Sequence, residues 1–484
     1  MRHNPNDSSI RKQYSELREI QGFIQKESWV RNKNLDSITL MAERKEKQLK
    51  VYLNSKNKHS EGSKVENIYK YLRPGEAIVD FTHYSRITPA LVDSIWYGAF
   101  ILQYGNPDPA FVNICTEGEL NNLINLPATG GPTDYQQNLL YPSTVLNNEK
   151  NLPGNRLYKL IWKPLLPWLN GMKTVYIIAD GALYKIAFHV LPADKGGYVC
   201  DKFDIRYLYH ASAITETNFR ITKKTTGVQL WGGIQYDTIA SLQNSGSKAL
   251  IKGIKASLSN NPASTESDWN YLPGTAKETE SIATLCLTSK IPYEVYSGTV
   301  ATEQSFKQNF GNNYDIIHIA THGRFDSSYF SRRQDFKSFS NLPFTLLKDP
   351  MNQVALIMAN RNTLKNSSED NLQEQDGLLN AGEIVKINSS EKRLVVLSAC
   401  ESGRGDIISA EGVYGMVRAF KMTGAQKVLI SLWKVPDEQT TEMMLVFYKK
   451  LLNGAPESVA LKHAQQYMSK KYTPYYWGGF VLME

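Results

Sequence analysis

The spacing of apolar residues along the chain changes twice, and the first 60 residues show a helical pattern. Ile10, Leu17 and Ile24 lie at heptad spacing, and the run 40–53 consists of strong helix formers, which predicts two amphipathic helices. Helices this short do not bury their apolar stripes alone, so we expect them to pack on other residues. The polar segment 54–63 is typical of a linker.

Between residues 69 and 222, short apolar runs alternate with helical patterns, which predicts one α/β domain. The expected strands are 77–81, 96–103, 175–179, 185–190 and 203–208. A turn is predicted at Asp180-Gly181. The polar stretch 221–228 and the loop-rich region 241–269 then separate this domain from the rest of the chain.

The last region begins with a capping-box pattern at Thr275 and Glu278, which predicts the start of a helix. A strand at 293–296 and a short helix after Thr302 follow. Three strongly apolar runs come next, at 315–320, 394–398 and 428–432. Strands that are apolar throughout are buried on both faces, as in a parallel sheet covered by helices.

Two helices are predicted around the third apolar run. One carries an apolar stripe from Val413 to Phe420 and ends at Gly424, and the other spans 443–452 and ends at Gly454. The chain therefore belongs to the α/β class, with a mostly parallel sheet flanked by helices.

Composition supports a folded protein with several domains. The chain has 484 residues, of which 42% are hydrophobic and 11% aromatic, and this length favours two or three domains. It contains no apolar run of about 18 residues, and its first ten residues are polar and charged. We therefore expect a cytoplasmic protein without a membrane segment.

The net charge of +8 is concentrated at one end of the chain. Residues 1–60 carry 13 Lys plus Arg against 7 Asp plus Glu, which is most of the excess. Because these basic residues are interleaved with acidic ones in helical register, they indicate a solvated helix face. Nucleic acid is not expected to bind directly.

The cysteine and histidine residues do not form a metal-binding pattern. Cys115, Cys200, Cys286 and Cys400 are scattered singly, without CxxC spacing. The close pair His318 and His322 lacks the glutamate of a zincin helix. We therefore expect no metal and no cofactor, with the first three cysteines and His318 as core residues.

Polar residues follow the apolar runs where a parallel sheet collects its functional groups. Thr321-His322-Gly323 follows the first run and Cys400 follows the second, so we expect the imidazole and the thiol to meet. An imidazole that removes the thiol proton makes the cysteine a nucleophile toward a carbonyl carbon. The backbone N–H groups of Gly323 and Cys400 are the expected oxyanion hole.

Several segments resemble the CHAT peptidases, which are caspase-like proteases related to separase and commonly attached to TPR repeats. The segments are DIIHIATHGRF (315–325), DGLLNAGEI (376–384), LVVLSACESGRGD (394–406), EGVYGMVRAFKMTGAQKVLISLWKVPD (411–437) and WGGFVLM (477–483). Upstream, VYIIADGALYKIAFHVL (175–191) is similar to the non-catalytic half of that family. The resemblance covers roughly residues 65–484, and no TPR array is readable in the chain.

The resemblance implies a caspase-like fold with His322 as general base and Cys400 as nucleophile. After the helical segment and linker that the residue pattern predicts at 1–63, it implies a pseudo-catalytic half at 64–225 and a catalytic half at 226–484. The expected activity is that of a cysteine endopeptidase that cleaves a protein substrate. Its regulation is expected to depend on an activating protein partner or on an upstream domain.

Two acidic residues suggest what the substrate pocket recognises. Glu411 begins the helix after the nucleophile loop, and Asp437 follows the third apolar run, so either residue is a candidate to bind a basic side chain. Each also has a purely structural interpretation. Glu411 suits a helix N-terminus electrostatically, and Asp437 suits a helix cap.

Alternatives to a cysteine peptidase remain open. The chain is also interpretable as a caspase-like scaffold that binds a partner without cutting it. A serine hydrolase that uses Ser402 has little support because no GxSxG motif surrounds that residue. The long connection 326–375 between the histidine and cysteine runs is predicted either to control assembly of the site or to be a passive insertion.

Overall fold

The computed structural model describes residues 65–88, 91–124, 153–193, 196–216, 224–237, 269–325, 354–364, 376–387, 389, 391–398, 410–433 and 435–484. Contacts divide the chain into two compact units, and we describe the unit formed by Ile68–Arg332 and Asp349–Glu484. The predicted N-terminal helices and the linker at 54–63 lie outside the described residues.

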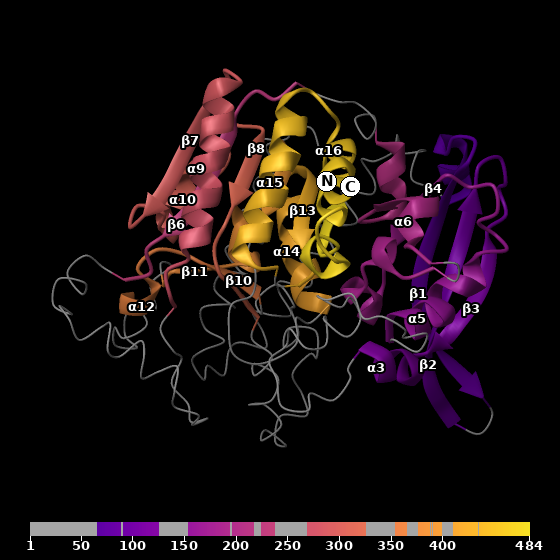
Figure 1. Ribbon diagram of the computed structural model, residues 1–484. Helices are drawn as coiled ribbons and strands as arrows, with labels where there is room; N and C mark the ends of the chain where they lie inside the picture. Colours follow the sequence, from indigo (N-terminus) through magenta and orange to yellow (C-terminus); the bar gives the residue numbers. More distant parts are fainter. Residues whose placement is uncertain are drawn as a thin grey trace, which may run out of the picture. The chain divides into compact units, whose positions relative to one another are not determined.

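An 11-stranded sheet forms the centre of this unit, in the order β3-β2-β1-β4-β5-β14-β13-β12-β8-β6-β7 (Figure 1). Neighbouring strands pair in parallel except for β1–β2, β2–β3 and β13–β14. The strands are β1 (Glu76–Thr88), β2 (Leu91–Gln103), β3 (Ala110–Thr116), β4 (Thr174–Ile178), β5 (Asp204–Tyr207), β6 (Val228–Ile234), β7 (Tyr293–Gly298), β8 (Ile316–Ile319), β12 (Lys392–Leu397), β13 (Ala425–Ser431) and β14 (Phe480–Met483).

The predicted α/β class with a mostly parallel sheet is confirmed. Every residue of β6, β8, β12 and β14 is buried, as expected for strands covered on both faces, although β12 begins with the charged residues Lys392 and Arg393. Because one sheet includes strands from both predicted halves, it does not locate the boundary between them. The divisions after residues 63 and 225 stay predictions.

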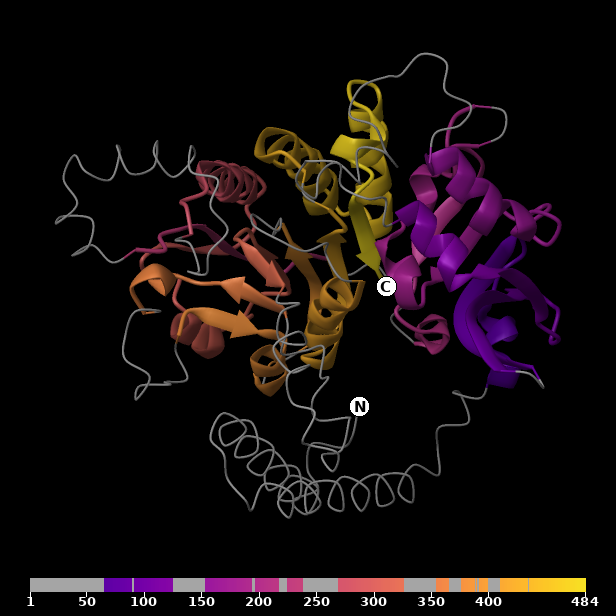
Figure 2. The same cartoon turned by 90° about the horizontal axis from the view of Figure 1, so that it is seen from below.

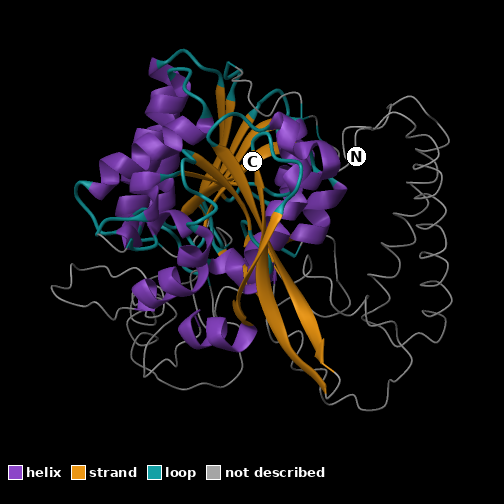
Figure 3. Cartoon of the chain, turned by 90° about the vertical axis from the view of Figure 1, so that its right-hand side faces the viewer, coloured by secondary structure: helices purple, strands orange, loops and turns teal. Residues whose placement is uncertain are grey.

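Helices cover both faces of the part of the sheet that is formed by β14, β13, β12, β8 and β6. Figure 2 shows α9, α15 and α16 on one face and α10, α13 and α14 on the other, and Figure 3 shows helices on both sides of the strands. These helices are α9 (Pro273–Thr288), α10 (Glu303–Asn309), α13 (Ala381–Lys386), α14 (Ala410–Met422), α15 (Asp437–Leu452) and α16 (Glu457–Ser469). The described residues also form α3 (Glu117–Ile124), α5 (Pro153–Leu157), α6 (Val199–Lys202) and α12 (Arg361–Leu364).

Glycines end two of the covering helices where the sequence predicts it. α14 is followed by Gly424 with φ of 98°, and α15 is followed by Gly454 with φ of 90°. Residues with a side chain rarely adopt this left-handed conformation, so glycine is favoured just beyond a helix end.

The predicted start of α9 is wrong, because Thr275 and Glu278 do not form a capping box there. The helix begins earlier, at Pro273, and Leu272 is its N-cap residue. Proline is common at the first helical position, because the N–H that it lacks would have no acceptor within the helix. The Thr275 hydroxyl donates to the Leu272 carbonyl at 2.8 Å, and Glu278 is buried within the helix instead of closing a capping box.

One predicted strand, 185–190, is also wrong. Two 3-10 turns replace it, η5 (Gly181–Lys185) and η6 (Phe188–Val190). Gly181 has φ of 53°, which turns the chain directly after β4. Phe188 and Val190 are nevertheless fully buried, so the apolar residues indicated burial correctly and secondary structure incorrectly.

A second, three-stranded antiparallel sheet lies beyond the end of β8. Its order is β11-β10-β9, with β9 (Gly323–Phe325), β10 (Val354–Ile357) and β11 (Leu378–Asn380). The β10 strand belongs to the connection 326–375, and its Ile357 N–H donates to the His322 carbonyl at 2.9 Å. Part of the connection therefore packs beside the predicted base.

Candidate active site

The predicted catalytic residues follow two neighbouring strands in the sequence. β8 and β12 pair in parallel, with Ile319 opposite Leu397, and the Ser398 N–H donates to the Ile319 carbonyl at 2.9 Å. His322 follows three residues after β8. Cys400 follows two residues after Ser398 and lies outside the described residues.

His322 is buried, with 3% of its surface exposed, and a backbone carbonyl orients its ring. The Nε2 atom lies 2.7 Å from the carbonyl oxygen of Asn270. Because a carbonyl only accepts hydrogen bonds, Nε2 must carry the proton. In the neutral ring, Nδ1 then holds the lone pair and is the atom that can accept a proton.

Two aromatic rings enclose the imidazole. The ring centroids of Tyr236 and Trp269 lie 5.0 Å and 5.1 Å from that of His322. The Tyr236 hydroxyl shares a hydrogen bond of 2.9 Å with Thr321, whose hydroxyl donates to the Ile357 carbonyl at 2.6 Å. Burial raises the pKa of Tyr236 to about 12, so this wall stays neutral at physiological pH.

Gly323, the predicted oxyanion-hole residue, opens β9 beside His322. A Cβ atom built on Gly323 would meet no heavy atom within 4 Å. The space next to this backbone is therefore open, as an approach by a substrate would require.

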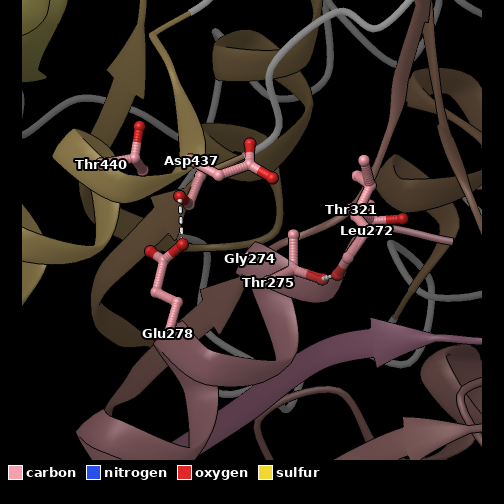
Figure 4. A pocket seen from close by; sticks show the side chains of 8 residues that line it. Leu272, Gly274, Thr275, Glu278, Thr321, Asp437 and Thr440 are labelled. Carbon is pink, nitrogen blue, oxygen red and sulfur yellow. Dashed lines mark hydrogen bonds between the residues drawn. The ribbon is translucent and has the colours of Figure 1, made fainter.

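A small, partly open pocket lies beside Thr321 and Ser398. Figure 4 shows seven of its lining residues labelled, with the carboxylates of Glu278 and Asp437 coming from different helices. The lining is Leu272, Gly274, Thr275, Glu278, Thr321, Ser398, Asp437 and Thr440. Its polar groups are hydroxyls and two carboxylates, a set that suits a cationic ligand group.

Glu278 is the pocket residue that sequence reasoning assigned to a different role. It is only 2% exposed, and its carboxylate accepts a hydrogen bond of 3.1 Å from the Ser398 hydroxyl. Its other oxygen lies 3.2 Å from Nε2 of His318, whose Nδ1 lies 3.2 Å from the Tyr448 hydroxyl. His318 is fully buried, which confirms its predicted place in the core.

Asp437 lines the pocket. It is the first residue of α15, and Pro436 occupies the N-cap position instead. Gly274 makes room for it, since a Cβ on Gly274 would lie 2.5 Å from an Asp437 carboxylate oxygen. Glu411 is the second residue of α14, and its side chain lies outside the described residues.

The other three cysteines are structural. Cys115 and Cys286 are buried and Cys200 is half-buried, and all three are free thiols. Burial raises the pKa of each thiol to about 12. They are therefore protonated and unreactive at neutral pH.

The described ranges lack two kinds of feature. No group of three or more His, Cys, Asp or Glu residues there is arranged to hold a metal ion. No helix in the same part of the chain is long and apolar enough to cross a membrane.

Two known proteins match a short part of this chain. Tetratricopeptide repeat protein 28 from Homo sapiens is 38% identical over 112 residues, and its Mus musculus counterpart is 38% identical over 109. Each match covers 22% of this chain, which spans only 4% of the length of either relative.

Among solved structures, the Saccharomyces cerevisiae separase–securin complex matches with TM-scores of 0.40 and 0.37 in two crystal structures, at 9% and 8% identity. Each match covers 86% of this chain and 30% of the other. The CHAT domain family model matches residues 151–484. This range includes β8, β12, the pocket and His322, and the chain belongs to the CHAT domain family.

Proposed function

We propose that this protein is a cysteine endopeptidase that cleaves a partner protein, with His322 as general base and Cys400 as nucleophile. The hydrogen bond from Nε2 of His322 to the Asn270 carbonyl carries the proposal. It leaves Nδ1 as the proton acceptor, at the end of a strand that adjoins the strand leading to Cys400.

In the proposed reaction, Nδ1 of His322 accepts the thiol proton as the Cys400 sulfur attacks the scissile carbonyl carbon. The N–H groups of Gly323 and Cys400 stabilise the negative oxygen that develops. The C–N bond then breaks, and the amine leaves with the proton from His322. Water hydrolyses the resulting thioester and regenerates the thiol.

We also propose that the pocket binds a basic side chain of the substrate, on the amino-terminal side of the scissile bond. Glu278 and Asp437 both line it, and Ser398, two residues before the proposed nucleophile, connects it to the reaction centre. Glu411 is a further candidate by its position at the start of α14. A carboxylate in a partly desolvated pocket favours Arg or Lys over apolar side chains.

Regulation by a partner protein or upstream domain is part of the proposal. The connection 326–375 is the proposed target, because its β10 and α12 segments contact the His322 site. Hydrogen exchange at 354–364 that is equal with and without an activating partner would contradict this mechanism.

The dyad is tested by comparing wild type with Cys400→Ala and His322→Ala in native cells. Co-purified partners are analysed for new termini by mass spectrometry. We expect each variant to lose cleavage by about a thousandfold or more with an unchanged circular dichroism spectrum. The matched control Cys286→Ala should retain activity.

Full cleavage by folded Cys400→Ala would overturn the mechanism. If wild type binds partners that stay uncut, the chain is instead a non-cleaving scaffold.

A further inference from the structure

Asn362 connects the long histidine–cysteine connection to the surroundings of His322. It lies in α12 and is 4% exposed. The Trp269 N–H donates to its Oδ1 at 2.7 Å, and its Nδ2 donates to the Trp269 carbonyl at 2.9 Å. One side-chain amide therefore pairs with both backbone groups of Trp269, as a neighbouring strand would.

The backbone of Asn362 holds the opposite wall of the site. Its N–H donates to the Tyr236 carbonyl at 3.0 Å. Two residues earlier, the Asn360 N–H donates to the Gln235 carbonyl at 3.1 Å. Tyr236 and Trp269 are the two rings that enclose His322. Asn362 thus holds both walls of the imidazole site, one through its side chain and one through its backbone.

The pairing with Trp269 also determines where the next carbonyl points. Asn270 follows Trp269 directly, and its carbonyl accepts the proton on Nε2 of His322 at 2.7 Å. Position and tautomer of the base therefore depend on the backbone at 269–270. Buried hydrogen bonds of this kind fix the orientation of a catalytic side chain before the reaction, so that little reorganisation is needed in the transition state.

We propose that Asn362 is a positioning residue for His322: it holds the Trp269 backbone, so that the Asn270 carbonyl keeps the imidazole proton on Nε2. The inference rests on the proposed function of His322 as base. It also links the connection 326–375 to the base through Trp269 and Asn270. The neighbouring Arg361 donates to the Asp376 carbonyl at 2.9 Å, so α12 contacts both the His322 site and the segment that leads toward β12.

The side-chain chemistry permits a graded test. Asn362→Asp keeps an acceptor for the Trp269 N–H but loses the donor to the Trp269 carbonyl. Asn362→Leu keeps a similar volume and loses both bonds. Asn380→Ala is the matched control, because it also removes an asparagine side chain, here a half-buried one whose Oδ1 accepts from the Glu383 N–H at 2.9 Å and caps α13.

The experiment measures the tautomer of His322 in the full chain from its ring ¹⁵N chemical shifts, assigned by their loss in His322→Gln. We expect the Nε2–H form to dominate in wild type and in Asn380→Ala. In Asn362→Leu the ratio of Nε2–H to Nδ1–H should fall at least about threefold, with kcat reduced about 10- to 100-fold and KM nearly unchanged. Asn362→Asp should give intermediate values.

An unchanged tautomer ratio in folded Asn362→Leu would overturn the inference. If that variant does not fold, an unchanged ratio in Asn362→Asp would do the same. A wild type that cleaves nothing contradicts the proposed function, whereas the tautomer measurement still decides the role of Asn362.

Discussion

Two carboxylates of the pocket differ sharply in their surroundings. Glu278 is buried on α9 beside Ser398 and His318, whereas Asp437 is exposed at the start of α15. A ligand cation in the pocket would therefore meet one carboxylate with little competing water and one at its rim. Buried charge contacts contribute more to specificity than exposed ones because they are less screened.

Removing pocket charge should change substrate preference. We expect Glu278→Gln to lower kcat/KM for substrates cut after Arg or Lys by about 30-fold, equivalent to about 2 kcal/mol, and Asp437→Asn to lower it by less. The measurement is cleavage of a peptide library by folded variants. Glu280→Gln is the control, since Glu280 is exposed on the same helix as Glu278. Cleavage after apolar residues that neither pocket variant alters would exclude this specificity.

Thiol reactivity separates the proposed nucleophile from the structural cysteines. Because burial raises the pKa of Cys115, Cys200 and Cys286 to about 12, few of these thiols ionise at pH 7.5. We expect iodoacetamide to label Cys400 at least about tenfold faster than any of the three, as measured by peptide mass spectrometry. Labelling of Cys400 that is equal or slower in the active protein would argue against an activated thiol.

At the scale of elements, α10 attaches to the segment leading to β11 through one buried glutamate. Glu303 is 2% exposed, and its carboxylate accepts from the Gly377 N–H at 3.0 Å. Lys307 bridges Glu303 and Glu383 of α13. Burial first, and then the nearby Glu383 carboxylate, raise the pKa of Glu303 to about 8.

This raised pKa makes stability depend on pH. Between about pH 4.5 and 8 the folded protein keeps the Glu303 proton and the unfolded chain loses it, so the free energy of unfolding falls as pH rises. Glu303→Gln cannot ionise, so we expect it to gain about 1–3 kcal/mol relative to wild type between pH 5 and pH 9. Urea unfolding at both pH values measures this, with exposed Glu438→Gln as control. A constant difference between Glu303→Gln and wild type would contradict the ionisation mechanism.

The sequence predicts elements well where burial leaves a periodic pattern. The apolar runs before His322 and Cys400 are β8 and β12, and both helices that end at glycine are found. The prediction is less reliable where one residue type serves two purposes. The spacing of Thr275 and Glu278 matches a capping box, but tertiary contacts with Ser398 determine the role of Glu278.

The site was predictable only in part for a related reason. His322 is identifiable because its chemistry depends on its side chain and on its place after a strand. Its hydrogen-bond acceptor is a backbone carbonyl at Asn270, which any residue type supplies. Asn362 is equally hidden, because its contacts with Trp269 and Tyr236 join three segments that are distant in sequence.

At the scale of the whole described unit, contacts on one face of the sheet and pairing within it connect early and late segments of the chain. Tyr184 and Tyr209 stack on Tyr414 of α14 with ring centroids 4.3 Å and 5.2 Å away. In the sheet itself, β14 pairs in parallel with β5 and antiparallel with β13. The helix that follows the nucleophile loop is thus packed against residues from the first part of the chain.

The position of β14 has a consequence for synthesis on the ribosome. Met483 pairs with Tyr207 on one side and Val428 on the other, so residues 480–483 lie between strands translated much earlier. Until they emerge, a nascent chain that already contains β5 and β13 cannot pair those two edges with their native partner. Unpaired strand edges can pair with other chains, so during this interval the exposed edges of β5 and β13 are the sites that chaperones would need to cover. The same delay keeps the sheet that carries β8, and His322 after it, incomplete during translation.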